Sequence, residues 1–447
     1  MRLRSLGRYW LIFSCCWAPA RRSIAFSWRP ASTQRGYQNV IYACLVNFLL
    51  NRETPAETAS PAAPLSGLLS GRQHALDGLR TVAVAGVFLF HTVAGFAPGG
   101  SIGVDVFFTL SGFVITLLIM KEYRATGRLR LRVFYAKRLA RLWPALLVLC
   151  AVVVTGGLIF PSSGWGGQAA DAIPAAGYVM NLSNFGAFGS STGGGALSPT
   201  WTLAVEEQFY LIWPLLLLLM LRFWRVRTVA WVTAVLAAGF LVSRFVLVSG
   251  GASLARLYNG PDTRADELLL GCAVALVLSS IRPGSRFHGS LQAGVRRGGP
   301  FAALALVAAV FALKEPTTPG AWFDVFWTAG PTTLAILAGL VIGWLVLQPD
   351  GLISRVLSHR WLSGPGRDLS YGMYLWHLPV FILLIPLVPS LAVRVPLTAA
   401  LTVLAAYGSF RFVEAPIRRW ASRRLDPAVV RPVPERELAG AASEIRR

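Results

Sequence analysis

The chain has 447 residues, of which 55% are hydrophobic and only 14% are charged. Soluble domains carry about 25% charged residues, so this composition excludes an ordinary soluble globular enzyme. The high apolar content equally excludes an intrinsically disordered chain. The formal net charge is +22. This charge suits either a nucleic-acid-binding protein or a membrane protein whose basic residues gather in particular loops, and the positions of those residues distinguish the two.

Ten apolar runs along the chain are about as long as a membrane span. Each has roughly 15 to 22 residues, against the ~20 that cross a hydrocarbon core. Because backbone groups inside a bilayer must be satisfied within the segment, each run is predicted to form a helix. The runs begin near Leu76, Ser101, Trp143, Trp201, Val229, Asp266, Phe301, Trp327, Ser370 and Val395. We therefore predict an all-α polytopic membrane protein with about ten transmembrane helices.

Basic residues fall on alternate connections between these runs. Residues 121–141 contain eight Lys or Arg residues, whereas residues 161–200 contain none. Lys and Arg accumulate in cytoplasmic loops, so the alternation predicts that both termini are cytoplasmic. Topology thus accounts for the positive charge, and we expect a lipid bilayer, not nucleic acid, as the partner. The predicted location is the inner (plasma) membrane, crossed many times.

Three regions are expected along the chain. The apolar run from Tyr9 to Ala20 imitates a signal peptide. Cleavage after it would place the next span in the wrong orientation for the charge pattern. We therefore expect residues 1–70 to be a disordered or loosely membrane-associated cytoplasmic extension, with a misassigned start codon as the alternative. Residues 71–420 are expected to form the membrane domain, and residues 421–447 a flexible cytoplasmic tail.

Ionisable residues inside the predicted spans are candidates for function, because each costs ~2.5–3.5 kcal/mol on insertion scales. In the first span, Arg80 and His91 are eleven residues apart, which is roughly 16 Å along a helix and close to three whole turns. A cation at the mouth and an imidazole deeper inside suit a ligand with an anionic head and a reactive far end. Alternatively, Arg80 extends to lipid headgroups and His91 is hydrogen-bonded between helices.

The second span and the basic connection after it add further candidates. Asp105 is a carboxylate near the outer end of the second span, suited to orient a histidine or an acceptor hydroxyl. The step from Ser111 to Gly112 is expected to allow close packing of helices. Arg138 and Arg141 are three residues apart, share one helical face and can clamp a phosphate. Ordinary loop charge is the alternative explanation for these two arginines.

Acidic pairs open two later spans. Glu206 and Glu207 begin the fourth span, and neighbouring residues of a helix point about 100° apart, so at most one faces a given cavity. Either one can bind an acceptor or pair with an internal arginine such as Arg244. Asp266 and Glu267 open the sixth span in the same way. Acids at helix N-termini also complement the helix dipole, which makes the pattern weak evidence of a site.

The ninth span contains an aromatic run that ends in a histidine. Tyr374 is a candidate for contact with the substrate, and Trp376 is interpreted as part of the aromatic belt at the membrane interface. His377 is interpreted as a structural histidine. The histidines of the chain show no HExxH or Cys-paired spacing, so no metal site is expected.

Several of these segments together resemble the integral-membrane acyltransferase-3 family, which contains bacterial surface-sugar O-acetyltransferases. Five matching segments occur in the family's order and cover residues 72–420. The matching pieces are Leu76 to Arg80 with His91, Gly103 to Phe113, Arg138 with Arg141, Trp201 to Pro214, and Ser370 to His377. The stretch from Phe412 to Pro416 also fits the end of the family's pattern.

The resemblance implies an acyl transfer from acetyl-CoA or another acyl-CoA on the cytoplasmic side, without a metal. Under this interpretation Arg80, Arg138 and Arg141 bind the phosphates of the donor. His91 is the general base that deprotonates the acceptor hydroxyl, with a transient acyl-histidine as the less favoured variant. Asp105 or Glu207 orients the acceptor or the imidazole.

The acceptor and two rival functions stay open at this stage. The resemblance implies a hydroxyl of a cell-surface glycan or glycolipid, approached from the outer side. The candidates for contact with the acceptor are Glu206, Asp266, Glu267 and Tyr374. Acyl tailoring of a small natural product, such as a macrolide sugar, is an alternative within the same family. A proton-coupled transporter is the alternative from another class, because helices with internal Arg, His and acids also suit that function.

Overall fold

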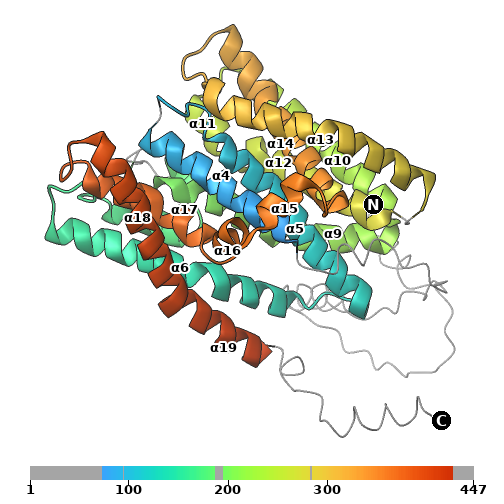
Figure 1. Cartoon of the computed structure of the whole chain (residues 1–447), viewed down its shortest axis with the longest axis horizontal. Helices are drawn as coiled ribbons and strands as arrows, with labels where there is room; N and C mark the ends of the chain where they lie inside the picture. The colour runs from blue at the N-terminus through green and yellow to red at the C-terminus, as the bar shows by residue number, and fades with distance from the viewer. Residues whose placement is uncertain (1–72, 94, 187–194, 282–283, 426–447) are drawn as a thin grey trace, which may run out of the picture. The chain divides into compact units, whose positions relative to one another are not determined.

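The computed structural model describes residues 73–93, 95–186, 195–281 and 284–425. This part of the chain is helical and contains no β-strand (Figure 1). The predicted extension 1–70, and the predicted tail from residue 426 onward, lie outside the described residues. In chain order the helices are α4 (His74–Thr92), α5 (Ile102–Thr126), α6 (Leu131–Ile159), α7 (Ala169–Ala176), α8 (Met180–Asn184), η1 (Ser198–Thr200), α9 (Trp201–Phe223), α10 (Val226–Ser249), α11 (Leu254–Asn259), α12 (Pro261–Ser280), α13 (Arg286–Ala312), α14 (Ala321–Leu347), α15 (Leu352–Ser358), α16 (Arg360–Asp368), α17 (Ser370–Leu384), α18 (Leu391–Ser409), the π-helical turn η2 (Phe410–Glu414) and α19 (Ala415–Leu425).

Every one of the ten predicted apolar runs forms a helix, and the chain is an all-α polytopic membrane protein. Among the described residues, eight helices are long and apolar enough to cross a membrane, with α18, η2 and α19 continuous as one of them. The other two predicted runs are α12 and α17. Helix α17 has only 15 residues. Helix α12 carries four ionisable side chains in its first two turns, so neither is an ordinary span.

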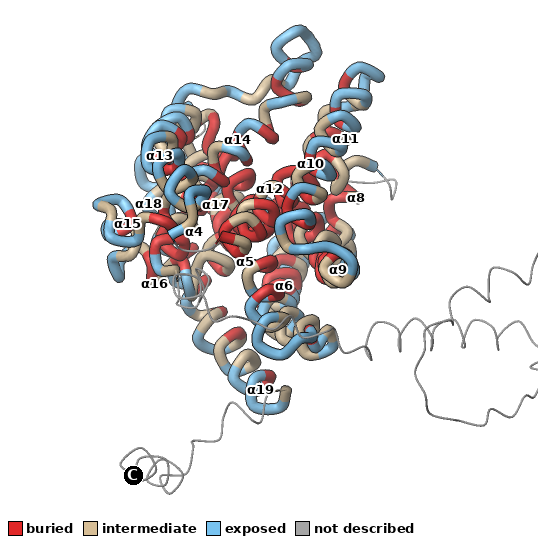
Figure 2. Tube along the Cα trace, turned by 90° about the vertical axis from the view of Figure 1, so that its right-hand side faces the viewer, coloured by how far each residue is buried: buried red, intermediate tan, exposed pale blue. Residues whose placement is uncertain are grey.

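Helix α12 tolerates these charges because protein surrounds it. It is mostly buried and lies in the middle of the other helices, in contact with α5, α9, α10 and α14 (Figure 2). Glycines bring it close to α5: a Cβ added at Gly112 would lie 1.9 Å from the Leu268 carbonyl oxygen, and one at Gly271 would lie 1.9 Å from that of Thr109. Small residues permit this approach, so the predicted packing role of Gly112 is confirmed.

Burial separates the inner helices from those that face lipid. In the apolar segment of α5, 72% of the residues are buried, compared with 17% in α13 and 22% in α10. Large apolar side chains such as Phe301 and Leu304 of α13 are exposed. A bilayer is as apolar as these side chains, so their exposure is expected in a membrane span.

Two helices begin well before the apolar runs that predicted them. Helix α6 begins at Leu131, not near Trp143, and α13 begins at Arg286, not near Phe301. Arginine is a good helix former, so basic segments next to an apolar span continue its helix. As a result, Arg138 and Arg141 lie on α6 and project from a helix instead of a loop. We call the region around Arg80 of α4, Arg138 and Arg141 of α6 and Ser370 of α17 the basic end.

Candidate active site

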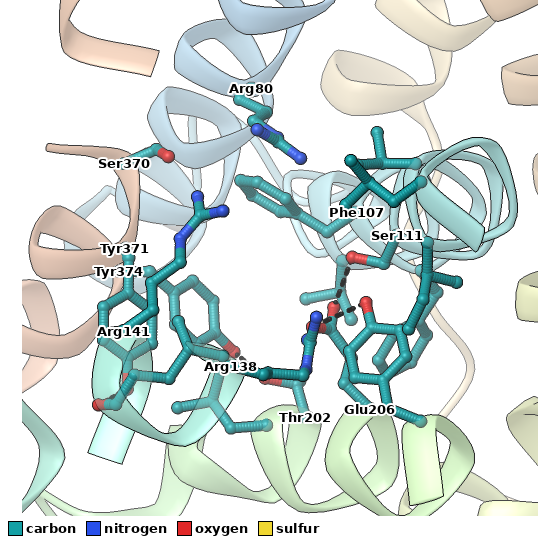
Figure 3. A pocket seen from close by; sticks show the side chains of 18 residues that line it. Arg80, Phe107, Ser111, Arg138, Arg141, Thr202, Glu206, Ser370, Tyr371 and Tyr374 are labelled. Carbon is teal, nitrogen blue, oxygen red and sulfur yellow. Dashed lines mark hydrogen bonds between the residues drawn. The ribbon is translucent and has the colours of Figure 1, made fainter. Parts of the chain in front are cut away.

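A cavity lies at the basic end, between α4, α5, α6, α9 and α17 (Figure 3). Its volume is about 130 Å³, below the ~300–1,000 Å³ typical of small-molecule sites, so it would hold only part of a larger ligand. Six of the residues singled out from the sequence line it, although they come from five different helices. These six are Arg80, Ser111, Arg138, Arg141, Glu206 and Tyr374.

Three arginines surround this cavity. Arg80 projects from α4, and Arg138 and Arg141 project from α6, with their guanidinium groups directed into the same space (Figure 3). Arg80 lies 3.7 Å from the Asp77 carboxylate. No dashed hydrogen bond joins Arg141 to another residue drawn in Figure 3. Guanidinium groups form paired hydrogen bonds with phosphate, so the cavity is built to hold an anionic group.

The Arg138 guanidinium is held in place from two sides. Its Nε donates to both carboxylate oxygens of Glu207, at 2.9 and 3.2 Å. Its central carbon lies 3.3 Å from the ring centroid of Tyr210, in a cation–π contact. The structure therefore places Glu207 against an arginine of the cavity, and not against His91 as the orienting role would require.

Glu206 and Ser111 form a polar contact beside Arg138 (Figure 3). The Ser111 hydroxyl donates to Glu206 Oε1 at 3.0 Å, and the Tyr210 hydroxyl lies 3.5 Å from Oε2. Ser111 thus has a polar role at the cavity in addition to the packing predicted for it. The adjacent acids Glu206 and Glu207 point to different partners, as their spacing on a helix predicted.

Tyr374 closes the inner side of the cavity. Its hydroxyl donates to the Pro199 carbonyl at 3.0 Å and accepts from the Thr202 hydroxyl at 2.8 Å. Its ring lies 6.2 Å from that of Phe107, measured between centroids. Because both functions of the hydroxyl are used within the protein, Tyr374 shapes this wall mainly with its ring.

One turn beyond Tyr374, α17 brings a second histidine to His91. His377 Nε2 lies 3.3 Å from His91 Nδ1, and the ring centroids are 5.0 Å apart. His91 is itself about 16 Å from Arg80 along α4, at 1.5 Å per residue. The sequence did not predict this pairing, since the two residues are 286 positions apart. Trp376, predicted to lie in the interfacial belt, is instead buried in the core between the helices.

The remaining predicted acids lie in buried ion pairs outside the cavity. Arg264 Nη1 donates to Asp105 at 3.2 Å and to Glu267 at 3.0 Å. Asp266 accepts from Arg244 Nη1 and Nη2 at 3.1 and 2.9 Å. One buried carboxylate oxygen of Glu267, Oε2, has no hydrogen-bond partner in the part of the chain that the structure describes. The structure brings none of the three acids to His91 or to the arginines of the cavity.

The ion pairs of α12 are enclosed by aromatic and hydroxyl groups. The Arg264 guanidinium carbon lies 5.0 to 5.8 Å from the ring centroids of Tyr258, Trp201 and Trp327. Arg244 also donates to the carbonyls of Thr263 and Thr328 at 2.5 and 3.0 Å. In the part of the chain that the structure describes, no group of three or more His, Cys, Asp or Glu side chains is arranged to hold a metal ion.

Comparison with known proteins identifies a family for this chain. Residues 73–413 match a family model described as an acyltransferase domain. The chain is 33% identical over 357 residues to the peptidoglycan O-acetyltransferase OatA of Listeria monocytogenes, a match that covers 77% of this chain and 55% of that protein. It is 32% identical over 361 residues to the O-acetyltransferase OatA of Staphylococcus aureus, covering 77% of this chain and 57% of the relative.

The match covers only part of each relative, but it covers the whole site of this chain. This chain spans little more than half the length of these relatives. The matched segment includes all the helices that line the cavity and both histidines of the pair. No solved structure matches the chain.

Proposed function

Because this chain belongs to the acyltransferase family whose model covers residues 73–413, we propose that it is a membrane O-acyltransferase. It moves an acetyl or other short acyl group from an acyl-CoA to a hydroxyl group of a cell-surface glycan or glycolipid. The names of the relatives, which are O-acetyltransferases and in one case act on peptidoglycan, support a cell-wall glycan as the acceptor.

One observation carries this proposal: three arginines line a cavity at one end of α4, and a paired histidine lies at the other end. An acyl-CoA is anionic at its nucleotide end and reactive at its thioester, with a long flexible arm between them. Arg80, Arg138 and Arg141 supply the cations for the phosphates. His91 lies about 16 Å further along the same helix, which suits an extended ligand.

Different residues bind the donor, remove the proton of the acceptor and guide the acyl arm. Arg141 and Arg80 hold the donor phosphates, and Glu207 holds Arg138 in the orientation needed for the same task. His91 removes the proton of the acceptor hydroxyl as that oxygen attacks the thioester carbonyl, which is general base catalysis. Tyr374 and Phe107 form the aromatic wall between the two regions and guide the acyl arm.

The direction of transfer follows from the distribution of charge. The basic end carries the residues that favour the cytoplasmic side, so the donor enters from the cytoplasm and the acceptor approaches from the other face of the inner membrane. Asp105, Asp266 and Glu267 maintain the fold of α12 beside this route through their ion pairs.

The test is binding and slow hydrolysis of acetyl-CoA by purified protein in detergent, comparing wild type with His91→Ala. His74→Ala is the matched control, because His74 is an exposed histidine at the start of the same helix. We expect saturable binding by all three proteins and thioester cleavage by wild type and His74→Ala only. Cleavage by His91→Ala at the wild-type rate would remove His91 from the mechanism.

Two further outcomes bear on the alternative functions. Absence of binding for every short acyl-CoA would overturn the proposal and favour proton-coupled transport. If acetyl-CoA is cleaved, transfer is assayed with a cell-wall glycan fragment beside a small glycosylated natural product. Transfer to the second acceptor alone would assign the chain to natural-product tailoring.

A further inference from the structure

The surroundings of His91 and His377 show which ring nitrogen donates and which accepts in the contact between them. Each ring also forms a hydrogen bond to a backbone carbonyl, His91 to that of Val87 and His377 to that of Tyr374. His91 Nδ1 lies 3.0 Å from the Val87 oxygen, and His377 Nδ1 lies 2.6 Å from the Tyr374 oxygen. A carbonyl oxygen only accepts hydrogen bonds, so each Nδ1 must carry a proton.

The protonation of the remaining nitrogens follows. A neutral imidazole carries one proton, so with Nδ1 protonated in both rings each Nε2 has a free lone pair. The single proton on His91 Nδ1 is therefore shared between the Val87 oxygen at 3.0 Å and His377 Nε2, which accepts at 3.3 Å. His91 Nε2 is then the basic atom of the pair. His377 is only 1% exposed, whereas His91 is partly exposed, so only His91 can present its Nε2 to a ligand.

We infer that His377 is a positioning residue for the transfer reaction: its Nε2 accepts the proton on His91 Nδ1 and so fixes His91 with Nε2 as the base. The inference rests on the proposed function, because the base acts in the acyl-transfer step proposed above. In that step the hydroxyl oxygen of the acceptor forms a bond to the thioester carbonyl carbon while its proton passes to His91 Nε2. The carbon–sulfur bond breaks with its electron pair on sulfur, and the leaving thiolate takes the proton from Nε2, which regenerates neutral His91.

Three substitutions at one position test the geometry. His377→Gln places an amide near the position of Nε2 that can accept from His91. His377→Asn places its amide near Nδ1, where it reaches the Tyr374 carbonyl but not His91. His377→Phe fills the space without an acceptor. We expect kcat to fall about 10²-fold in the Asn and Phe variants, since general base catalysis contributes roughly 10²–10⁴-fold, and to stay within about tenfold of wild type in the Gln variant.

The KM for acetyl-CoA is expected to stay unchanged in all three variants, because His377 lies outside the arginine-lined cavity. A merely structural role predicts a different pattern, in which activity follows thermal stability and the Asn and Gln variants behave alike. That pattern would overturn the inference, as would a Phe variant with wild-type kcat.

A second measurement does not depend on turnover. The nitrogen-15 chemical shifts of the imidazoles in protein reconstituted in lipid report which nitrogen of His91 carries the proton, and His91→Gln assigns its signals. We expect Nδ1–H with an unprotonated Nε2 in wild type. Finding Nε2–H instead overturns the inference even in an active enzyme. Conversely, the expected tautomer in a protein that binds no acyl-CoA would leave the positioning geometry intact and overturn only the proposed function.

Discussion

Glu207 binds Arg138 through both of its carboxylate oxygens, at 2.9 and 3.2 Å from the same Nε atom. This pair joins α9 to α6 at the wall of the cavity, where both side chains are partly buried. If Glu207 orients an arginine, it affects the affinity for an anionic ligand. If it oriented His91, it would affect the rate of the chemical step. The location of the pair favours the first role.

Replacing Glu207 by Gln should therefore weaken donor binding more than turnover. Loss of a hydrogen bond to a charged group costs about 1.5–3 kcal/mol, so we expect the KM for acetyl-CoA to rise roughly tenfold or more while kcat changes little. Steady-state kinetics in detergent measure both. Glu122→Gln is the control, because Glu122 pairs with Arg130 in a more exposed position at 3.6 Å. A fall in kcat at constant KM would instead assign Glu207 to the chemical step.

Arg141 should make the largest individual contribution to donor affinity among the three arginines of the cavity. It lines the cavity with an exposed side chain, whereas Arg138 is already held by Glu207. Arg141→Ala is expected to raise the Kd for acetyl-CoA roughly 10- to 100-fold, at 1.5–3 kcal/mol for a charge-assisted contact. Arg141→Lys should be intermediate, because it keeps the charge and loses the paired geometry.

The control for Arg141 lies on the same helix. Arg132 is exposed on α6 and does not line the cavity, so Arg132→Ala should bind acetyl-CoA like wild type. Equilibrium binding at low and moderate ionic strength measures all three variants, and the difference between Arg141→Ala and wild type should shrink as salt screens the charge. Equal losses in the Arg132 and Arg141 variants would mean that the arginines of α6 set topology only.

Local sequence patterns predicted the parts of the site that depend on one helix. The three-residue spacing of Arg138 and Arg141 and the eleven-residue spacing of Arg80 and His91 are properties of single segments, and each pair lies on one helix. Each apolar run predicted a helix for the same reason, because a span must satisfy its own backbone, although only eight of the described helices are long and apolar enough to cross a membrane.

Local sequence patterns could not predict the contacts of the site that join different helices. His377 has the same surroundings in sequence whether or not His91 is its neighbour, and only the packing of α4 against α17 brings the two together. The same holds for Trp376, because an aromatic residue near a helix end is equally compatible with the interface and with a core. The acids of α12 were visible in the sequence, but their arginine partners were decided by the central position of that helix.

The close approach of α5 and α12 should make Gly112 intolerant of a side chain. A Cβ there would meet the Leu268 backbone, which cannot move aside without shifting α12. Gly112→Ala is expected to lower the free energy of unfolding by about 1–3 kcal/mol or more, as overpacking does. Gly239 on α10 is the control, since a Cβ there meets nothing within 4 Å. Thermal unfolding in detergent should show Gly239→Ala unchanged or slightly more stable.

Asp266 and Arg244 are both fully buried and pair with each other at 2.9 Å, which predicts how their variants combine. Asp266→Leu alone leaves a buried guanidinium without its counter-ion and should cost about 3–5 kcal/mol of stability. Arg244→Met with Asp266→Leu removes both charges, so the double variant should recover most of the lost stability and retain acetyl transfer. Thermal unfolding and transfer activity are measured on both variants and on wild type. A stable double variant with no transfer would show that Asp266 contacts the substrate and does more than balance Arg244.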